Sequence, residues 1–248
     1  MNKYISPKIT IITVVFNGEK TIERTIYSVL SQNYNNIEYI IVDGGSNDKT
    51  LEIIHKYKQI KLISEKDDGI YDAMNKGIHI ATGDFILFLG ADDVLLTNET
   101  INDVLLHGLY NDALNFGNVY FKNSSMIYFG IFNETSLLHQ NVCHQAIFYP
   151  TWYLKENNFN LTYKIYADWE LNIRALKKLR LNYINIPITL FNETGISSKR
   201  KDSFIKDKKK IIRKTLGLKM LFRYYISYPR FLLRLIIKHC YYLLLIKG

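Results

Sequence analysis

The sequence predicts an α/β protein whose mostly parallel, Rossmann-like central sheet is flanked by helices. The uncharged run Phe-Ile-Leu-Phe-Leu at residues 85–89 follows a turn signal, which is typical of a strand buried on both faces. Strand-like and helix-like segments alternate with short links over residues 8–64, as in βαβ units. Two carboxylates, Asp92 and Asp93, follow the buried strand, at the edge where open α/β sheets bind ligands.

Each element of the first half follows from its residue pattern. β-Branched residues fill the first strand, residues 8–17, and Asn17-Gly18 ends it. The helix at 21–32 carries apolar residues at helical spacing, with Thr21 expected as its N-cap. Next, in chain order, we expect a strand at 38–42, a helix at 49–57, a strand at 60–64, a helix at 70–81 and the strand at 85–89.

The second half is expected to mix strands and helices. Residues 113–149 alternate apolar and polar side chains, with Asn, Ser and Gly between them, which is typical of antiparallel strands. Around this segment we expect helices at 97–110 and 166–179 and a strand at 183–190. Residues 215–246 place basic side chains on one helical stripe beside apolar faces, with a kink expected at Pro229.

Charge is distributed unevenly along the chain. Residues 199–248 carry 15 Lys and Arg against 2 Asp, a net charge of +13, whereas residues 1–198 carry 17 basic and 21 acidic residues, a net charge of −4. The acidic main body argues against a nucleic-acid partner. Arg234 and Lys238 interrupt the apolar stretch of the tail, so we expect it to lie on an anionic membrane surface rather than to span a bilayer. The alternative is a helix that packs on the domain.

The bulk composition is that of a globular protein. Its 248 residues, 48% hydrophobic and 22% charged, are enough for one α/β domain with an appendage. The apolar run at residues 9–16 is too short for a signal peptide, and Cys143 and Cys240 show no metal-ligand or disulfide spacing, so we expect a cytoplasmic protein. The sequence contains no Walker loop or HExxH motif and no GxGxxG after the first strand, which excludes the classes that depend on them.

Several polar residues are candidates for chemistry at the ends of these elements. Asp92 and Asp93 suit an oxygen-preferring divalent cation that carries substrate phosphates, or else they cap the next helix. Asp43 ends the second strand before two glycines, so it can accept a hydrogen bond from a base or ribose. Asn17 ends the neighbouring strand. For Asp43 and Asn17 the alternative is turn chemistry.

The remaining candidates lie on a loop and two helices. Lys76, on the helix that follows the Asp68 loop, offers positive charge to a diphosphate, although Asp72 and Lys76 also have the spacing of a simple surface ion pair. Asp168, beside Trp169, is either a general base or a helix N-cap. The polar pair at residues 144–145 enters an apolar strand, and the alternative for its histidine is a core residue with its hydrogen bonds satisfied.

The order of these motifs resembles the family 2 glycosyltransferases. Within that family the sequence is most similar to bacterial enzymes of colanic-acid, capsule and O-antigen biosynthesis. The resemblance covers about residues 8–198, and the block at 43–93 is its most specific part. The motifs that carry it are Thr13-Val-Val-Phe-Asn17, Tyr39-Ile-Ile-Val-Asp43-Gly-Gly-Ser-Asn-Asp48, Asp67-Asp-Gly-Ile-Tyr-Asp-Ala-Met-Asn-Lys-Gly77 and Phe88-Leu-Gly-Ala-Asp-Asp93.

The resemblance implies a GT-A fold and a transfer reaction. A nucleotide-sugar-binding half, about residues 1–96, would join an acceptor-binding half, residues 97–198, ahead of a basic tail at 199–248. With Mn²⁺ or Mg²⁺, the enzyme would move one hexose-type sugar, with inversion, from a nucleotide diphosphate, UDP being favoured. The acceptor would be a saccharide hydroxyl on a polyprenyl diphosphate. The protein would then lie peripherally on the inner membrane face and serve cell-surface polysaccharide synthesis.

The resemblance also implies roles for single residues, namely those that occupy the positions of the family's site residues. Asp168 corresponds to the catalytic base and Asp92 to the metal ligand. Gly90 replaces the first Asp of the DxD motif and leaves fewer carboxylates for a cation, while Ala167 replaces an acid that often precedes the base. The QxxRW motif of processive synthases is absent, which indicates one sugar per acceptor. The implied donor contacts are Val15, Asn17, Asp43, Asp68, Lys76, Ala91 and Asp92. The implied acceptor or diphosphate contacts are His144, Gln145, Trp169 and Ser197, the last in a Gly-Ile-Ser loop.

Two other functions would require features that this sequence lacks. A sugar nucleotidyltransferase would need a glycine-rich, Arg-containing loop after the first strand, and residues 16–20 do not supply one. A nucleic-acid-binding protein acting through the basic tail would show salt-dependent binding to any duplex, and the sequence carries no nucleic-acid-binding motif.

Overall fold

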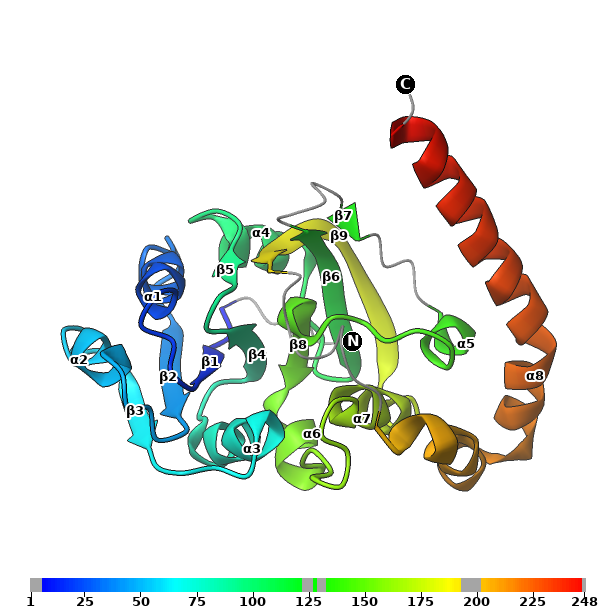
Figure 1. Ribbon diagram of the computed structural model, residues 1–248, viewed down its shortest axis with the longest axis horizontal. Coiled ribbons are helices and arrows are strands. Elements are labelled where there is room, and N and C mark those ends of the chain that lie inside the picture. Colours follow the sequence, from blue (N-terminus) through cyan, green and yellow to red (C-terminus); the bar gives the residue numbers. More distant parts are fainter. Residues whose placement is uncertain (1–5, 122–126, 129–132, 193–201, 247–248) are drawn as a thin grey trace.

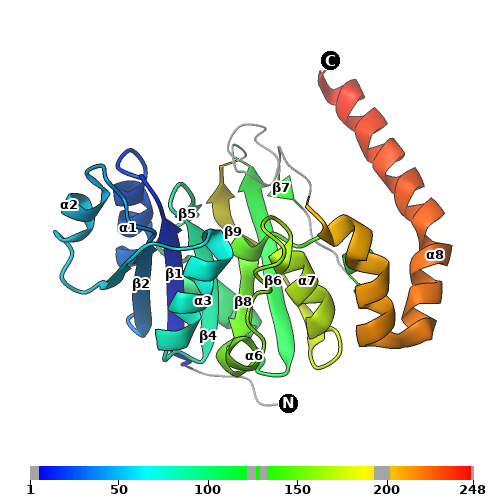
Figure 2. The ribbon, with the colours of Figure 1, turned by 60° about the horizontal axis from the view of Figure 1, so that its bottom comes forward.

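The computed structural model describes residues 6–121, 127–128, 133–192 and 202–246. One sheet runs through the middle of the molecule, with helices on both of its faces (Figures 1 and 2). Its strands are β1 (Ile9–Val15), β2 (Ile37–Asp43), β3 (Lys61–Ser64), β4 (Phe85–Gly90), β5 (Val94–Leu95), β6 (Ala113–Phe121), β7 (Ile127–Tyr128), β8 (Ile147–Pro150) and β9 (Arg180–Phe191). They lie in the order β3-β2-β1-β4-β8-β6-β9-β5, and β7 pairs with β6.

The first four strands form a parallel half-sheet. Strand β1 lies between β2 and β4, with Val15 opposite Asp43 and Val14 opposite Gly90. The carboxyl ends of these three strands therefore meet at one edge, and the residues that follow them in the chain lie close together there.

The other half of the sheet is mixed. Strand β8 runs antiparallel to both β4 and β6, β6 and β9 are parallel, and β5 is antiparallel to β9. The expectation of a mostly parallel sheet therefore holds for β1 to β4, while residues 113–150 supply antiparallel strands, as their alternating pattern predicted.

Helices cover the sheet because its buried strands are apolar on both faces. The side chains of Ile86 and Phe88 pack into one core, whereas those of Phe85, Leu87 and Leu89 pack into the other. The helices are α1 (Ile22–Leu30), α2 (Thr50–Ile54), α3 (Ile70–Ile80), α4 (Thr100–His107), α5 (Glu134–Leu137), α6 (Thr151–Glu156), α7 (Ala167–Ala175) and α8 (Phe204–Ile246), with a 3₁₀ turn η1 (His144–Ala146).

The structure corrects two details of the sequence-based prediction. Thr21 occupies the N-cap position of α1, but its side chain makes no capping bond and its hydroxyl instead donates to the carbonyl of Gly18. The short elements β5, α5 and α6 were not expected, since segments of two to six residues leave too little periodicity to read.

Helix α8 bends at Gly217 and not at the expected Pro229. Gly217 has φ 84° and ψ 177°, a conformation that glycine adopts at little cost, whereas Pro229 lies inside the helix. Before the bend, Phe204 and Ile212 are buried against the body. After it, the helix runs up one side of the molecule and away from the sheet (Figure 1). Within the described ranges, no helix is long and apolar enough to cross a membrane.

Candidate active site

The acidic pair lies where β4 ends, and its two carboxylates have different environments. Asp93 is buried and accepts hydrogen bonds from the backbone N–H of Asn192, at 2.9 Å, and from Nε2 of Gln145, at 3.2 Å. Burial raises the pKa of Asp93 to about 6, with a further contribution from the charge of Asp92. Asp92 is partly exposed, and its Oδ2 accepts from Nδ2 of Asn192 at 2.9 Å.

Helix α1 fixes the backbone of this acidic turn. The hydroxyl of Thr25 lies 2.9 Å from the carbonyl of Ala91 and 2.7 Å from that of Asp93. Arg24 donates to the carbonyl of Asp92 at 2.8 Å. The orientation of the Asp92 carboxylate therefore depends on a rigid turn rather than on a free loop.

The acidic pair fits a cation that brings ligands of its own. Among the residues that the structure describes, no cluster of three or more His, Cys, Asp or Glu could bind a metal. Asp93 already binds Asn192 and Gln145, which leaves Asp92 as the accessible carboxylate. One carboxylate suits Mn²⁺ or Mg²⁺ when phosphate oxygens and water complete the coordination, so the residues fit a diphosphate-borne cation and not an all-protein site.

Asp168 lies in the first turn of α7, and both of its carboxylate oxygens have hydrogen-bond partners. Its Oδ1 lies 3.0 Å from the hydroxyl of Tyr71 and 2.8 Å from the backbone N of Trp169. Its Oδ2 lies 2.9 Å from Nδ2 of Asn141 and 3.1 Å from Nδ1 of His144. Since an ionised carboxylate only accepts, His144 carries its proton on Nδ1 in this pair. Asp168 is buried, and protein donors hydrogen-bond to both of its carboxylate oxygens.

A short segment joins the two acidic centres. Asn141 and His144 contact Asp168, and the next residue, Gln145, donates to Asp93. Cys143 lies in the same segment. Burial, and then the charges of Asp168 and Asp93, raise the pKa of its thiol to about 12. The structure thus links the expected base and the expected metal-binding pair through one hydrogen-bonded segment.

The ends of β1 and β2 form the adjacent part of the edge. Asn17 is exposed at φ 53°, and its Oδ1 accepts from the backbone N of Asn47 at 3.0 Å. Val15 is buried, and its carbonyl accepts from Gly44. The carboxylate of Asp43 is fully buried and accepts from the turn that follows it, residues 45–46, and from Ser64. Asp43 therefore shapes this turn.

The loop before α3 contributes a second acid, Asp67, which belongs to the 67–77 motif but was not among the expected donor contacts. Asp67 lies against the Asp43 turn, so closely that a Cβ built on Gly44 would lie 2.3 Å from its Oδ2. Its neighbour Asp68, the residue chosen from the sequence, is exposed, and its backbone N–H donates to Asp72. Lys76 pairs with Glu65 at 2.9 Å, which is the main cause of its raised pKa, and with Asp72 at 3.4 Å.

Trp169, one of the expected contact residues, lies among apolar and aromatic neighbours. The indole of Trp169 is buried, donates to the carbonyl of Leu137 at 2.7 Å and lies 4.1 Å below the ammonium of Lys208. The indole of Trp169, the residue next to Asp168, therefore packs in the core. Ser197 lies outside the described residues.

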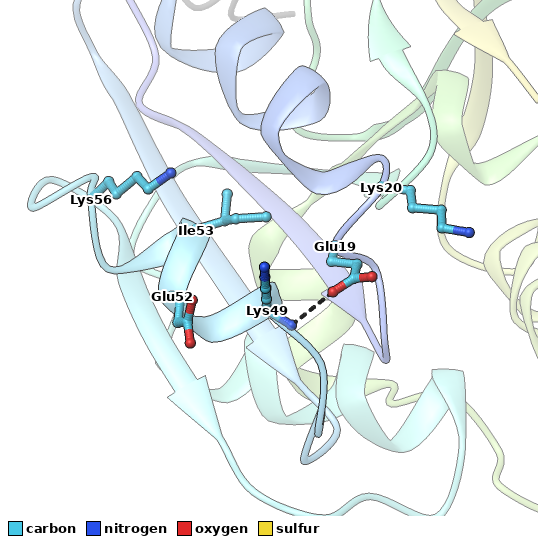
Figure 3. Close-up of a pocket in the computed structure, with 6 residues that line it drawn as sticks. All are labelled: Glu19, Lys20, Lys49, Glu52, Ile53 and Lys56. Atoms are coloured by element: carbon cyan, nitrogen blue, oxygen red, sulfur yellow. Dashed lines mark hydrogen bonds between the residues drawn. The ribbon is translucent and has the colours of Figure 1, made fainter.

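A separate surface pocket of about 280 Å³ lies between the loop after β1 and α2 (Figure 3). The carboxylate of Glu19 accepts from the backbone N of Lys49 across it at 3.0 Å. Its lining contains none of the residues expected to do chemistry: Glu19, Lys20, Lys49, Glu52, Ile53 and Lys56.

The sequence reading also missed the polar residues that fix the two acids. Asn192, Asn141 and Tyr71 lie far from these acids in sequence, and no spacing links any of the three to Asp92 or Asp168. The available signals were that Tyr71 lies in the 67–77 motif and that Asn192 opens the stretch 192–197, which contains the Gly-Ile-Ser loop.

Comparison with known proteins gives a consistent result. The model of glycosyl transferase family 2 matches residues 10–130. A PGL/p-HBAD biosynthesis glycosyltransferase of Mycobacterium bovis is 33% identical over 201 residues, covering 77% of this chain and 78% of that protein. An uncharacterized glycosyltransferase of Mycobacterium tuberculosis is 30% identical over 215 residues, covering 81% and 80%.

Solved structures share the fold at low sequence identity. S. aureus TarS in complex with UDP-GlcNAc superposes with a TM-score of 0.68 at 20% identity, covering 84% of this chain and 65% of that one. Mannosyltransferase PcManGT from Pyrobaculum calidifontis, in complex with GDP-Man and Mn²⁺, gives a TM-score of 0.65 at 15% identity, covering 89% and 70%. Together with the sequence relatives, these likenesses establish that the chain belongs to glycosyltransferase family 2 and is a glycosyltransferase with the GT-A fold.

Proposed function

We propose that this enzyme transfers one sugar, with inversion, from a nucleotide diphosphate to a hydroxyl of a lipid-linked saccharide. The observation that carries the proposal is the segment 141–145, which hydrogen-bonds to Asp168 through Asn141 and His144 and to Asp93 through Gln145. The nucleotide sugars named for the TarS and PcManGT complexes support a nucleotide-sugar donor.

In this proposal Asp168 is the general base. It takes the proton of the acceptor hydroxyl as that oxygen bonds to the anomeric carbon, while the bond from the anomeric carbon to the diphosphate breaks. The ring of His144, which donates to Asp168 and is only partly buried, moves aside for the acceptor. A divalent cation on Asp92 supplies neutralising charge for the leaving diphosphate.

The donor lies across the ends of β1, β2 and β4. Val15, Asn17 and the turn shaped by Asp43 form the nucleoside side, because they line the edge next to the acidic pair. Asp68 and Lys76, at the start of α3, approach the ribose and the diphosphate. Ala91 and Asp92 face the diphosphate from β4. Residues 144–145, Trp169 and Ser197 belong to the acceptor side in this arrangement.

The acceptor is a saccharide on a polyprenyl diphosphate, reached from the inner membrane face. Beyond Gly217, helix α8 exposes large apolar side chains, among them Leu218, Phe222 and Ile226, at 66%, 66% and 55%. The basic residues Lys219, Arg223 and Arg230 are exposed along the adjoining stripe. A helix with exposed apolar and cationic faces suits the surface of an anionic bilayer, and a membrane-bound acceptor fits a role in capsule or O-antigen synthesis.

A donor screen tests the reaction. The protein is incubated with Mn²⁺ and a panel of UDP-sugars and GDP-sugars, and release of the nucleoside diphosphate is recorded. We expect slow hydrolysis of one donor and none in Asp168→Asn. If no donor is consumed while binding to any duplex falls steeply with salt, the nucleic-acid function is favoured instead.

Vesicle flotation tests the membrane proposal. The protein should float with vesicles containing anionic phospholipid at low salt and remain unbound with neutral vesicles. An equal, salt-independent soluble fraction in both cases would remove the membrane from the proposal.

A further inference from the structure

A line of buried amides leads from the core to the expected base. The hydroxyl of Tyr149 donates to Oδ1 of Asn172 at 2.9 Å, Nδ2 of Asn172 donates to Oδ1 of Asn141 at 2.9 Å, and Nδ2 of Asn141 donates to Oδ2 of Asp168 at 2.9 Å. Asn172 and Tyr149 are both fully buried. Every donor in this line points toward Asp168.

Both ends of the line require the same orientation of the amides. An ionised Asp168 accepts only, so Asn141 must present its N–H₂ there and its oxygen to Asn172. At the other end, burial raises the pKa of Tyr149 well above its usual value, with a further contribution from the charge of Asp168, so its hydroxyl stays protonated and donates to Asn172. The reversed orientation would place the oxygen of Asn141 against the carboxylate.

Asn172 is a costly residue for packing alone. It lies on α7 one turn after Asp168, where an apolar side chain of similar size would fill the space. A buried amide costs free energy unless its polar atoms are paired, and Asn172 pairs on both sides. Its partners show what it does: it fixes the rotation of Asn141.

We propose that Asn172 is a positioning residue that acts through Asn141 to keep Asp168 ionised and correctly oriented for proton removal. This inference rests on the proposed role of Asp168. Asn172 touches neither donor nor acceptor, so its loss should lower kcat and leave the KM for the donor unchanged.

Other titratable groups also face the base and must be held constant. They come from the start of α3, the segment before β8, β8 itself and the residue before α7: Tyr71, Cys143, His144, Tyr149 and Tyr166. Of these groups only Tyr149, itself part of the amide line, contacts Asn172. A shift in the pH dependence of Asn172 variants therefore reports on the amide line.

The test compares Asn172→Leu with Tyr149→Phe. The first removes the N–H that fixes Asn141, so Asn141 can turn its N–H₂ away from the ionised base. The acidic limb of the kcat profile should then move up by about one pH unit, with kcat about tenfold lower near neutral pH. Tyr149→Phe deletes a hydrogen bond of the same line but keeps the N–H of Asn172 that holds Asn141. Its acidic limb should stay within a few tenths of a unit of wild type.

A second readout does not require turnover. The Asp168 carboxyl is followed by carbon NMR across pH, assigned with Asp168→Asn, and its midpoint should rise in Asn172→Leu and not in Tyr149→Phe. If the midpoint rises although no donor is ever consumed, the positioning role stands and the proposed function fails.

If the enzyme turns over donor and both pH readouts of Asn172→Leu match Tyr149→Phe, Asn172 only packs and the inference is overturned. Asn172→Ala, which needs no extra space, replaces Asn172→Leu if that variant does not fold.

Discussion

At the scale of single residues, Asp168 combines burial with hydrogen bonds from three other elements or loops. Asn has nearly the same shape, so Asp168→Asn should fold and bind nucleotide as wild type does. It cannot accept a proton, and we expect turnover to fall by ~10²–10⁴-fold, the usual contribution of a general base. Transfer rate and nucleotide affinity are measured on the same preparation. Undiminished turnover would take Asp168 out of this role.

Asp92 is the accessible member of the acidic pair, and its removal should affect the cation. In Asp92→Ala we expect activity to lose its dependence on Mn²⁺. Mn²⁺ binding followed by EPR in the presence of a nucleoside diphosphate should weaken as well. Asp103→Ala, at an exposed acid on α4, is the matched control. Wild-type Mn²⁺ titration curves in Asp92→Ala would rule out the assignment.

The residue scale also shows where sequence reasoning stops. Asp43 and Asp68 look like free acids in the sequence, yet Asp43 is fully buried by its own turn and by Ser64. Asp67, which lies against Gly44, is distinguished from Asp68 only by the path of the loop. Hydrogen-bond partners that come from other elements decide which oxygen of an acid remains available.

At the scale of elements, Glu38 ties β2 to its neighbours. Its carboxylate accepts from Thr10 on β1, from Lys61 on β3 and from Thr82 before β4. Burial alone would raise the pKa of Glu38, but these hydrogen bonds outweigh burial and bring it to about 2. Because the folded pKa lies below the unfolded value of 4.5, the stabilisation is complete above about pH 4.5 and is lost as pH falls toward 2.

Glu38→Gln should therefore be less stable than wild type at neutral pH, and the difference should shrink as pH falls from 4.5 toward 2. Urea unfolding at several pH values measures it. Glu52→Gln, at an exposed position on α2, should follow wild type throughout. A gap between Glu38→Gln and wild type that does not change with pH would contradict the linkage.

His139 joins the tail to the segment that contacts Asp168. Its ring stacks on Tyr224 at 4.6 Å and on Phe231 at 5.0 Å, and its Nε2 lies 2.8 Å from the hydroxyl of Ser227. Burial, and then the charge of Lys208, lower the pKa of His139 to about 4, so it is neutral near physiological pH. The same loop continues to Asn141, beside Asp168.

His139→Ala should release the outer part of α8 without unfolding the body. Hydrogen exchange should accelerate in residues 218–231 and stay unchanged in residues 204–216, because Phe204 and Ile212 remain buried. His107→Ala, at an exposed position, is the control. Equal exchange rates in His139→Ala and wild type would show that the stacking does not fix the outer part of α8.

At the scale of the whole molecule, α8 gives the enzyme a side on which large apolar residues and basic residues are both exposed. Replacing Phe222 and Ile226 by Ser should reduce flotation with anionic vesicles by about tenfold per residue, the effect of losing roughly 1.4 kcal/mol of apolar burial each. Tyr27→Ser, at a side chain 71% exposed on α1, should float as wild type does. Equal loss in both proteins would point to general destabilisation.

Much of the fold was predictable because its signals are local. The runs that became β1, β2 and β4 are apolar enough to be buried on both faces, and α1 and α3 show helical spacing. The order of motifs predicted the family, which the relatives confirm. The bend of α8 was assigned to the wrong residue, because Pro229 is a known helix breaker while the positive φ of Gly217 is visible only in three dimensions.

The sequence by itself determined the α/β class, the membership of family 2 and the presence of acids at strand and helix ends, since periodicity and motif order are properties of neighbouring residues. Only the tertiary structure decided which groups meet: that Asn192 reaches the acidic pair, that Gln145 and His144 join Asp93 to Asp168, and that Tyr149, Asn172 and Asn141 line up on the base. Such contacts arise where β8, α7 and β9 pack against the end of β4, and no local pattern specifies them, because hydrogen bonding between distant segments depends on the path of the whole chain.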